Sequence, residues 1–591
     1  MTSVIVEPTF SSEPESPAVE RQRRRGWFYY LVPAAAFVIL WSAFCFYIQA
    51  SKAAGQGRFI YALDDAYISM AIARNVAEHG TWGVHAGEFS SLASSIAWIL
   101  LIAGAYCFTD AGAREMIPLA LNFFFAAMLI ALVWHILWQR GVHVFWCFLT
   151  LLTVIFWTPI IPVAFTGLEH ILQACVTLAF VYATAQCLAD DVPPKAKRGA
   201  ATALLILAPL ATLVRYEGLF LLAVAALLFA LRKRFGMAFL VVAMGVLPLA
   251  VAGVIFMSHG WYFFPTTILL KGNAAPPASL AAISNFFDRG CNNFYLTPHL
   301  AVLLSAAVLA FLLFGRNVLR RLSGVMAVMF IGISLIHLEF AAVGWFFRYE
   351  SYLVCLGLVT FVLLAQDLPW RSIGAGIETS LLKSVIFLVA AMFLANPLIW
   401  RAIQSHLQTP RASCDNYLQQ YQMARFLNAY YPTAVVAAND IGAINYFVDG
   451  VHCFDLAGLS ELEIAKSRRS GEFGVATIEE LAKKRGVKIA IVYTNWFVPY
   501  RGLPRSWVKI GTWTIHNTVI CSPEVTFFAV DPTETKHLRK CFEEFEQELP
   551  ICQNGVVTRL TSPPPSKPAE KKTAKPTKQE KDSVAGKKEA A

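Results

Sequence analysis

The stretch RQRRRGWFYYLVPAAAFVILWSAFCFYIQ, residues 21 to 49, decides the fold class. Its basic start precedes about 23 apolar residues, which suffice for a helix across a bilayer and exceed the apolar part of a cleavable signal peptide. No clear cleavage site follows. We therefore expect this segment to anchor the chain, with residues 1–26 as a disordered N-terminus on the cytoplasmic side.

The remaining composition points to the same class of protein. Of the 591 residues, 57% are hydrophobic and only 15% are charged. Eleven further apolar stretches have the length or composition of membrane spans: 92–108, 116–138, 144–165, 169–188, 199–214, 216–231, 236–257, 299–315, 323–343, 350–366 and 381–398. The formal charge of +10 lies largely near the two ends of the chain. We expect a polytopic α-helical membrane protein with lipid around it and no nucleic-acid partner.

Short basic loops orient the predicted spans, because cytoplasmic loops are enriched in Lys and Arg. KAKR (195–198), RKR (232–234) and RNVLRR (316–321) are predicted to be cytoplasmic. Residues 50–91 are then predicted to lie outside, and four candidate spans separate them from the cytoplasmic KAKR. A chain that passes from one side to the other needs an odd number of crossings. Pro159 and Pro162 interrupt one of these four spans, which predicts a half-span or re-entrant segment. The result is about 11 crossings, with the C-terminal part in the periplasm of a bacterial inner membrane.

Residues 401–550 have the composition of a soluble α/β domain that follows the transmembrane part, residues 27–400. Four segments have the patterns of regular elements: helices over 415–431 and 478–486, and buried strands over 434–440 and 488–494. Asp415 is the expected cap of the first helix and Gly486 the stop of the second. The alternation predicts a small, mainly parallel sheet. Asn439 and Asp440 follow one strand, where a buried or capping role outweighs substrate contact.

Two further features of the sequence are its C-terminal tail and its cysteines. Residues 551–591 form a Pro/Lys/Ala-rich tail of low complexity that cannot bury a core. The twelve cysteines include no CxxC pair, which argues against a structural zinc site. Disulfides and buried thiols are both open for the five cysteines near the end: Cys414, Cys453, Cys521, Cys541 and Cys552.

Two adjacent carboxylates, Asp64 and Asp65, stand in IYALDDAYISMAIARN (60–75), directly before a helical pattern. Capping of that helix explains one carboxylate but does not need two. The apolar face of the pattern suits a helix along the membrane surface, which would hold the pair at the mouth of the bundle. There, a carboxylate can take a proton from an attacking hydroxyl. Alternatively, it can hold a divalent cation against a phosphate.

Further charged residues interrupt apolar spans on the same predicted face. Each cation alone is explained by a side chain that reaches the water boundary. Together they suggest cations that hold a lipid-linked phosphate and an anion that activates an acceptor. The candidate phosphate ligands are Arg215 in LVRYEGLF, Lys271 in WYFFPTTILLKGN and Arg348 in GWFFRYESYL. The supporting polar residues are Glu169 and His170 in TGLEH, Glu217 and Glu350; for His170 a structural hydrogen bond is the more probable role.

The order of these motifs, from DDAYI through TGLEH, LVRYEG, FFPTTILLK and FFRYESYL to NDIGAINYF and FDLAGL, resembles the GT-C superfamily of membrane glycosyltransferases. It is most similar to the branch of the terminal arabinofuranosyltransferase of the mycobacterial cell wall. The resemblance covers most of residues 27–530. It implies a polyprenyl-phosphate sugar donor and a catalytic base at Asp64 or Asp65.

This sequence also departs from the family pattern. It has Tyr216 where members often have proline in Arg-Pro-Glu, and Thr266 where they have asparagine in Pro-Asn-Thr. The segment GEFSSLASSIAW (87–98) lacks the aromatic and Thr-Ser-Pro pattern of the arabinosyl branch. These departures leave the sugar and the acceptor open.

The sequence therefore predicts an inverting transfer to a cell-envelope glycan or glycolipid on the periplasmic side. A competing class is a transporter or flippase of lipid-linked sugars, but internal hydropathy repeats typical of that class are not evident. A receptor whose spans merely anchor a sensing domain explains the many charged turns poorly.

Overall fold

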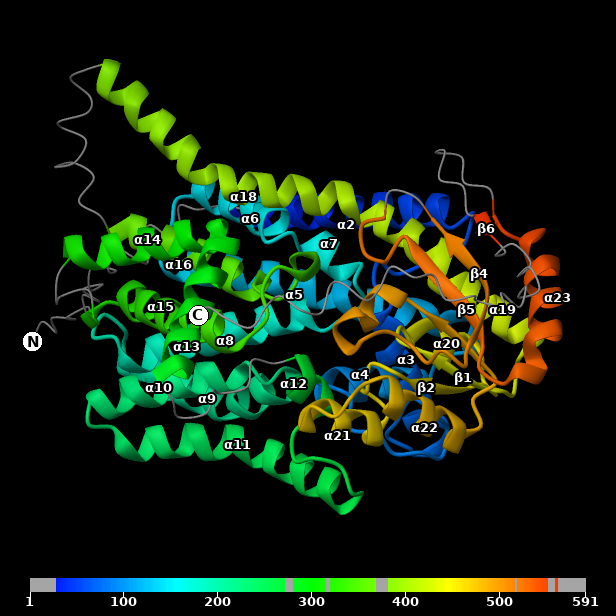
Figure 1. Ribbon diagram of the computed structural model, residues 1–591. Helices are drawn as coiled ribbons and strands as arrows, with labels where there is room; N and C mark the ends of the chain where they lie inside the picture. Colours follow the sequence, from blue (N-terminus) through cyan, green and yellow to red (C-terminus); the bar gives the residue numbers. More distant parts are fainter. Residues whose placement is uncertain are drawn as a thin grey trace, which may run out of the picture.

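The computed structural model describes residues 28–271, 280–314, 319–367, 381–515, 518–550 and 559–561. These residues form two parts, a bundle of long helices and an α/β domain that lies at one end of it (Figure 1). Helix α18 (Leu381–Asn416) runs along the bundle and leads the chain into the α/β domain. The predicted fold class is confirmed: the chain is a multi-pass helical membrane protein with a C-terminal α/β domain.

All twelve predicted apolar stretches contain helix. In chain order these helices are α2 (Phe28–Ala54), α4 (Ile96–Tyr106), α5 (Ile117–Gln139), α6 (Val144–Trp157), α8 (His170–Leu188), α9 (Pro194–Val214), α10 (Gly218–Leu231), α11 (Phe235–Ser258), α14 (Pro298–Phe314), α15 (Leu322–Phe340), α16 (Ser351–Asp367) and α18. In the described part of the bundle, α7 (Ile160–Ala164) is a second helix within the stretch 144–165, and α3 (Asp65–His79), α12 (Thr266–Lys271) and α13 (Leu280–Leu296) lie in the connections.

Length and composition identify the helices that can cross a membrane. Six helices of the described chain meet both conditions, or seven spans if the bent pair Phe287–Leu296 and Pro298–Leu312 is counted as one. Helices α4, α6, α10 and α16 are apolar but shorter. The number of about 11 crossings and the side of each loop therefore stay predictions.

The stretch over 144–165 is broken, as its prolines predict. Helix α6 ends at Trp157, and α7 begins after Pro159, whose backbone at φ −19° and ψ 81° is not helical. The short helix α7 is buried throughout. The break is confirmed, and a re-entrant path for this segment stays a prediction.

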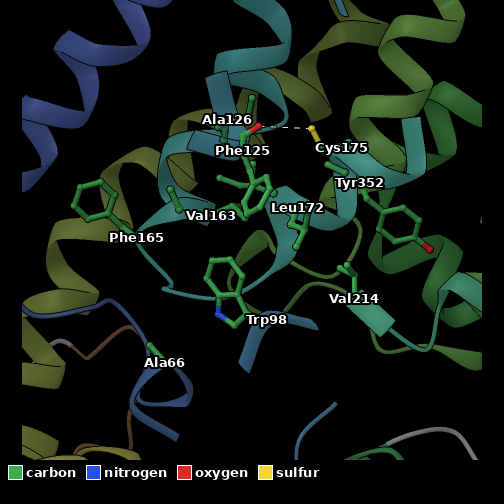
Figure 2. Packing of buried hydrophobic residues seen from close by; sticks show 14 of the residues in the cluster. Ala66, Trp98, Phe125, Ala126, Val163, Phe165, Leu172, Cys175, Val214 and Tyr352 are labelled. Carbon is green, nitrogen blue, oxygen red and sulfur yellow. Dashed lines mark hydrogen bonds between the residues drawn. The ribbon is translucent and has the colours of Figure 1, made fainter. Parts of the chain in front are cut away.

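The buried core of the bundle supports the loop that carries the two aspartates. Trp98 of α4 is fully buried in the same cluster as Leu172 and Val214 (Figure 2). Its indole N–H donates to the carbonyl oxygen of Gly167 at 3.2 Å. Gly167 has φ +72°, and a Cβ there would lie 2.7 Å from that of Ala66 in α3. The turn before α8 therefore needs glycine to let α3 approach the core.

The α/β domain contains one six-stranded sheet with the order β2-β1-β3-β5-β4-β6. Strand β1 (Val435–Ala438) pairs in parallel with β2 (His452–Asp455) and β3 (Ile489–Val492). The other pairings are antiparallel and join β3, β5 (Glu524–Ala529), β4 (Val508–Thr514) and β6 (Arg559–Thr561). The prediction of a mainly parallel sheet is wrong: two of the five described pairings are parallel and three are antiparallel, because β4 and β5 follow each other without a crossover helix.

The helices of this domain also correct one prediction. The helices are α19 (Gln422–Tyr430), α20 (Gly442–Phe447), α21 (Leu462–Ser470), α22 (Val475–Arg485) and α23 (Thr535–Glu546). Helix α22 ends at Gly486 as predicted, with φ 67°. Asp415 caps no helix, because α18 runs through it and continues by a π-helical turn into α19. Its carboxylate instead accepts the N–H groups of Val519 at 2.6 Å and Ile520 at 3.4 Å.

Several predictions fall at the ends of the chain. Cys414, Cys453, Cys521 and Cys541 form no disulfide within the described part of the chain, and Cys552 lies outside it. The predicted N-terminus, 1–26, also lies outside them, as does the predicted tail, 551–591, apart from β6.

Candidate active site between the helical bundle and the α/β domain

Asp64 joins the first loop to the α/β domain. Its two carboxylate oxygens accept the N–H groups of Gly442 at 2.6 Å and Ala443 at 2.7 Å, at the start of α20. It occupies the N-cap position directly before α3, but its side chain makes no capping hydrogen bond there. A Cβ on Gly442 would lie 2.1 Å from the carbonyl oxygen of Asp64, so this approach needs glycine. Asp64 is thus a cap, but of a helix 378 residues further along the chain.

Asp65 has a different environment from its neighbour. One carboxylate oxygen accepts a hydrogen bond from Arg348 Nη2 at 2.6 Å, and the other lies 4.0 Å from Lys271 Nζ. The side chain is 31% exposed and lines two cavities. Burial raises the pKa of Asp65, but the charges of Lys271 and Arg348 outweigh burial and hold it well below its usual range. Asp65 is therefore an ionised carboxylate that faces open space.

A strained turn presents Arg348. Phe346 and Phe347 both have positive φ, at 48° and 60°, which is rare for residues other than glycine. Arg401 Nη2 donates to the carbonyl oxygen of Phe347 at 2.5 Å. Glu350 accepts the N–H of Gly344 at 3.0 Å on the other side of the turn.

Glu350 is therefore a structural anchor of this turn. Its carboxylate lies 3.4 Å from Arg401 Nε and 3.2 Å from His299 Nε2, and only 1% of its side chain is exposed. Glu350 was predicted to support the site, and it does so from outside the cavities. It lines none of the three cavities described below, but it holds the backbone that carries Arg348.

Arg215, at the end of α9, is held by two carboxylates. Its Nη1 donates to Glu169 at 2.7 Å, and its Nη2 and Nε donate to Glu217 at 2.7 and 3.0 Å. Arg348 makes fewer contacts: its Nε and Nη1 are buried and have no partner among the described residues. The ring of Tyr349 lies against both guanidinium groups, at 5.9 Å from Arg215 and 5.0 Å from Arg348.

The Pro-Thr-Thr segment fixes Lys271. Thr266 links this segment to two other parts of the chain by hydrogen bonds. Its hydroxyl donates to the carbonyl oxygen of Leu459 in the α/β domain at 2.5 Å, and its N–H donates to the carbonyl oxygen of Ser91 at 3.1 Å. The hydroxyl of Thr267 donates to Leu92 in the first loop. Lys271 ends the short helix that begins with these threonines and is 47% exposed. The segment therefore brings a cation from a distant loop to Asp65.

His170 is buried beside this group. Its Nδ1 lies 3.3 Å from Gln173 Oε1, which can only accept, so Nδ1 carries the proton and Nε2 is left as an acceptor. Nε2 has no partner within the described chain. The structural hydrogen bond expected for His170 is present.

Three neighbouring cavities share wall residues at this place. The first, of about 90 Å³, is lined by all three predicted cations together with Asp65, Glu169 and His170. The second, of about 450 Å³, is shared with the α/β domain and contains Asp64, Asp65, Asn439, Asp440 and Tyr493 in its wall. The third, of about 280 Å³, has a mainly apolar wall and is lined by Glu217, Phe220, Phe264 and Phe340. Lys271 and Tyr349 border all three cavities.

The sequence did not single out several residues of these walls. Tyr349 stands between two residues that were selected, and only its place between two charges pointed to it. Trp345, Trp496 and Gln420 carried no signal, because nothing in a single sequence shows that a loop of the bundle and the end of β3 meet.

Asp64 and Asp65 both have positive or N–H partners already, and these partners would compete with a metal ion for the carboxylates. Asp64 is bound by two backbone N–H groups, and Asp65 faces Arg348 and Lys271. A cation at Asp65 would compete with these two positive groups.

One other group in the described residues has the composition of a metal site: His85, Glu88 and His452, whose ligand atoms lie within 4.8 Å of one another. The N–H of Cys453 donates to His85 Nε2 at 3.0 Å, so the neutral ring carries its proton on Nδ1, which faces Glu88 at 3.7 Å. The rings of His85 and His452 are stacked at 4.2 Å. These residues therefore connect the first loop to the α/β domain through a hydrogen bond and ring stacking.

Comparisons with known proteins match part of the chain to a family. Residues 408–529 match a family model described as a domain of unknown function (DUF8728). No curated protein matches the chain in sequence. The crystal structure of ArnT from Cupriavidus metallidurans in the apo state is similar over 86% of this chain and 99% of that one, with 12% identity and a TM-score of 0.48.

Two crystal structures of the Archaeoglobus fulgidus oligosaccharyltransferase are also similar, each at 12% identity. The complex with Zn and sulfate covers 84% of this chain and 73% of that one, with a TM-score of 0.43. The apo form covers 86% and 75%, with a TM-score of 0.46. At these identities and scores, the likenesses carry no conclusion about activity.

Proposed function

We propose that the protein is a membrane glycosyltransferase of the GT-C type. It transfers a sugar from a polyprenyl-phosphate donor to a cell-envelope glycan or glycolipid, on the periplasmic side of a bacterial inner membrane. The observation that carries this proposal is the order of the three cavities: an apolar groove, a junction lined by cations and a polar cavity. A polyprenyl-phosphate sugar has lipid, phosphate and sugar in the same order.

The phosphate has specific candidate ligands at the junction. Arg348 offers two buried N–H groups without a partner in the described chain, and Lys271 is half exposed beside it. Such cations bind phosphate through charge-assisted hydrogen bonds and stabilise the charge that develops as the phosphate leaves. Arg215 also borders the junction, but Glu169 and Glu217 neutralise it, so it contributes less.

Asp65 is the proposed base, and Asp64 the residue that positions it. An acceptor hydroxyl transfers its proton to Asp65 while its oxygen forms a bond to the anomeric carbon of the sugar. The bond from that carbon to the phosphate oxygen breaks, and its electron pair leaves with the phosphate. Attack opposite to the leaving group inverts the anomeric centre.

The ion pairs of Asp65 suggest how donor binding activates it. In the structure, Lys271 and Arg348 hold the pKa of Asp65 low, which makes it a weak base. A bound phosphate competes for the same two cations. Their weaker hold on Asp65 then raises its pKa, so that the base gains strength when the donor is in place.

A transporter of lipid-linked sugars is the second candidate, because the same three cavities would suit its cargo. It does not require a carboxylate held open beside the phosphate site. Bond cleavage separates the two functions.

The test uses purified full-length protein, a radiolabelled polyprenyl-phosphate sugar and a cell-envelope glycan extract. Label that moves into the glycan fraction supports the proposal. Label that stays on the lipid with every extract and every donor sugar contradicts it. A parallel reaction with a strong chelator tests whether a divalent cation takes part.

A further inference from the structure

We propose that the 450 Å³ cavity binds a hydroxyl-rich saccharide without anionic groups, and that this saccharide is the acceptor; the second half of this statement rests on the proposed function. The cavity lies between the bundle and the α/β domain, and both contribute to its wall. Three features of this wall lead to the proposal: its charge, two polar atoms without partners and two half-exposed tryptophans.

The charge of the wall disfavours an anionic acceptor. Four carboxylates line the cavity, those of Asp64, Asp65, Asp440 and Asp455. The two cations in the wall, Lys271 and Arg348, already face Asp65. A phosphate or uronate in this cavity would therefore meet like charges in a partly buried site, where repulsion is stronger than in water.

Two buried amides provide one donor and one acceptor. Asn439, which is 5% exposed, accepts the N–H of Tyr493 through Oδ1 at 2.9 Å, so its Nδ2 is the free donor. Gln420, which is 2% exposed, donates through Nε2 to Asp440 and to the Tyr493 hydroxyl, each at 2.9 Å, so its Oε1 is the free acceptor. Neither free atom has a partner among the residues that the structure describes.

A hydroxyl group matches this pair better than an anion does. Hydroxyl groups both donate and accept, so those of a saccharide can pair with a free amide N–H such as that of Asn439 and with a free amide oxygen such as that of Gln420. A phosphate dianion or carboxylate only accepts and would leave Gln420 unsatisfied. Buried polar atoms without partners are costly, so a ligand that pairs with both gains affinity.

Two tryptophans give the cavity apolar surface. Trp345 is 46% exposed and Trp496 is 49% exposed, and both line the cavity. Trp345 belongs to the strained turn before Arg348, and Trp496 to the 3₁₀ segment Thr494–Tyr500 after β3. Sugar rings have an apolar C–H face between their hydroxyl groups, which packs against an indole. A saccharide therefore uses both kinds of surface that this wall offers.

The proposal is tested by saturation-transfer NMR on the full-length protein in detergent, without donor. The probes are neutral trisaccharides of glucose, galactose, mannose and arabinose, with the matching uronic forms. The variants are Trp496→Ala and Asn439→Ala. The matched control is Val498→Ala, in the same 3₁₀ segment, which is 72% exposed and lies outside the cavity wall. Thermal melting of each variant shows that it is folded.

We expect at least one neutral trisaccharide to bind, and its uronic form to bind about tenfold more weakly. Trp496→Ala and Asn439→Ala should each weaken the neutral sugar by about tenfold, and Val498→Ala should leave it unchanged. The assignment is overturned if no neutral sugar of the panel binds, if the uronic form binds as tightly as the neutral form or more tightly, or if Val498→Ala weakens binding as much as Trp496→Ala.

This experiment also separates the two proposals. Saccharide binding that responds to these variants, with no consumption of any lipid-linked sugar, contradicts the proposed function and leaves the saccharide site standing. Consumption of the donor without saccharide binding contradicts only the site.

Discussion

Arg215 and Arg348 come from two different turns of the chain and line the same cavity, but they differ in the partners of their guanidinium groups. Arg215 has its charge matched by Glu169 and Glu217, each at 2.7 Å. Arg348 has one carboxylate, Asp65, and two nitrogens without partners in the described chain. A closed group of charges stabilises a fold, whereas an open one is free to take a ligand. We therefore propose that the Arg215 region stabilises the fold and that the Arg348 region takes part in the reaction.

The largest expected effect comes from removing the carboxylate of the open region. Asp65→Asn should lower sugar transfer by about 10²- to 10⁴-fold, because an amide cannot accept the hydroxyl proton. Its ion-pair counterpart in the closed region, Glu169→Gln, should lower transfer much less, since Glu217 still holds Arg215. Transfer rates with a saturating donor compare the two. Near-normal turnover by Asp65→Asn would mean that this carboxylate is not the base.

The two arginines themselves should respond to different measurements. Arg348→Gln removes a proposed ligand of the leaving phosphate and should lower transfer by about 10²-fold. Arg215→Gln leaves two buried carboxylates without a cation and should lower stability by about 3–5 kcal/mol. Transfer rate and thermal melting, measured on both variants, test the contrast. It fails if Arg215→Gln melts normally but loses transfer as Arg348→Gln does.

The sequence contained the charges of both regions but not their pairing. Periodicity and apolar runs located all twelve helical stretches and the strands β1 and β3, because these signals are local. Arg215, Lys271 and Arg348 were identified because they interrupt or follow apolar segments together with carboxylates, and ionisable groups at membrane depth are costly. Their different states depend on contacts across the fold, such as Arg215 with Glu169, 46 residues away. The same holds for Asp64, whose partners in α20 are 378 and 379 residues away.

The junction between the bundle and the α/β domain should be sensitive to one methyl group. Gly442→Ala places a Cβ 2.1 Å from the carbonyl oxygen of Asp64 and 2.6 Å from its carboxylate, so the cap of α20 must open. We expect a loss of stability of about 1–3 kcal/mol. Gly474→Ala is the control, since its backbone is extended, at φ −172°, and its nearest contact would lie 3.9 Å away. Equal melting temperatures of the two variants would contradict the role given to Asp64.

The smallest expected effect concerns two like charges near this cap. Burial and then the charge of Asp440 raise the pKa of Asp64, and burial raises the pKa of Asp440. A carboxyl whose pKa is raised by folding binds more protons in the folded state than in the unfolded state. Its stabilising effect is therefore full below the ordinary pKa of 3.8 and is lost as the pH rises through the raised value.

Asp440→Asn removes one of the two charges and gives Asp64 an amide neighbour in place of a carboxylate. We expect the melting temperature of the variant to fall less than that of the wild type between pH 4 and pH 7, so that the variant is the more stable of the two at neutral pH. Melting curves in one detergent across this pH range measure the difference. Parallel curves for the two proteins would show that Asp64 and Asp440 do not repel each other, and the cap would then owe nothing to the protonation of this pair.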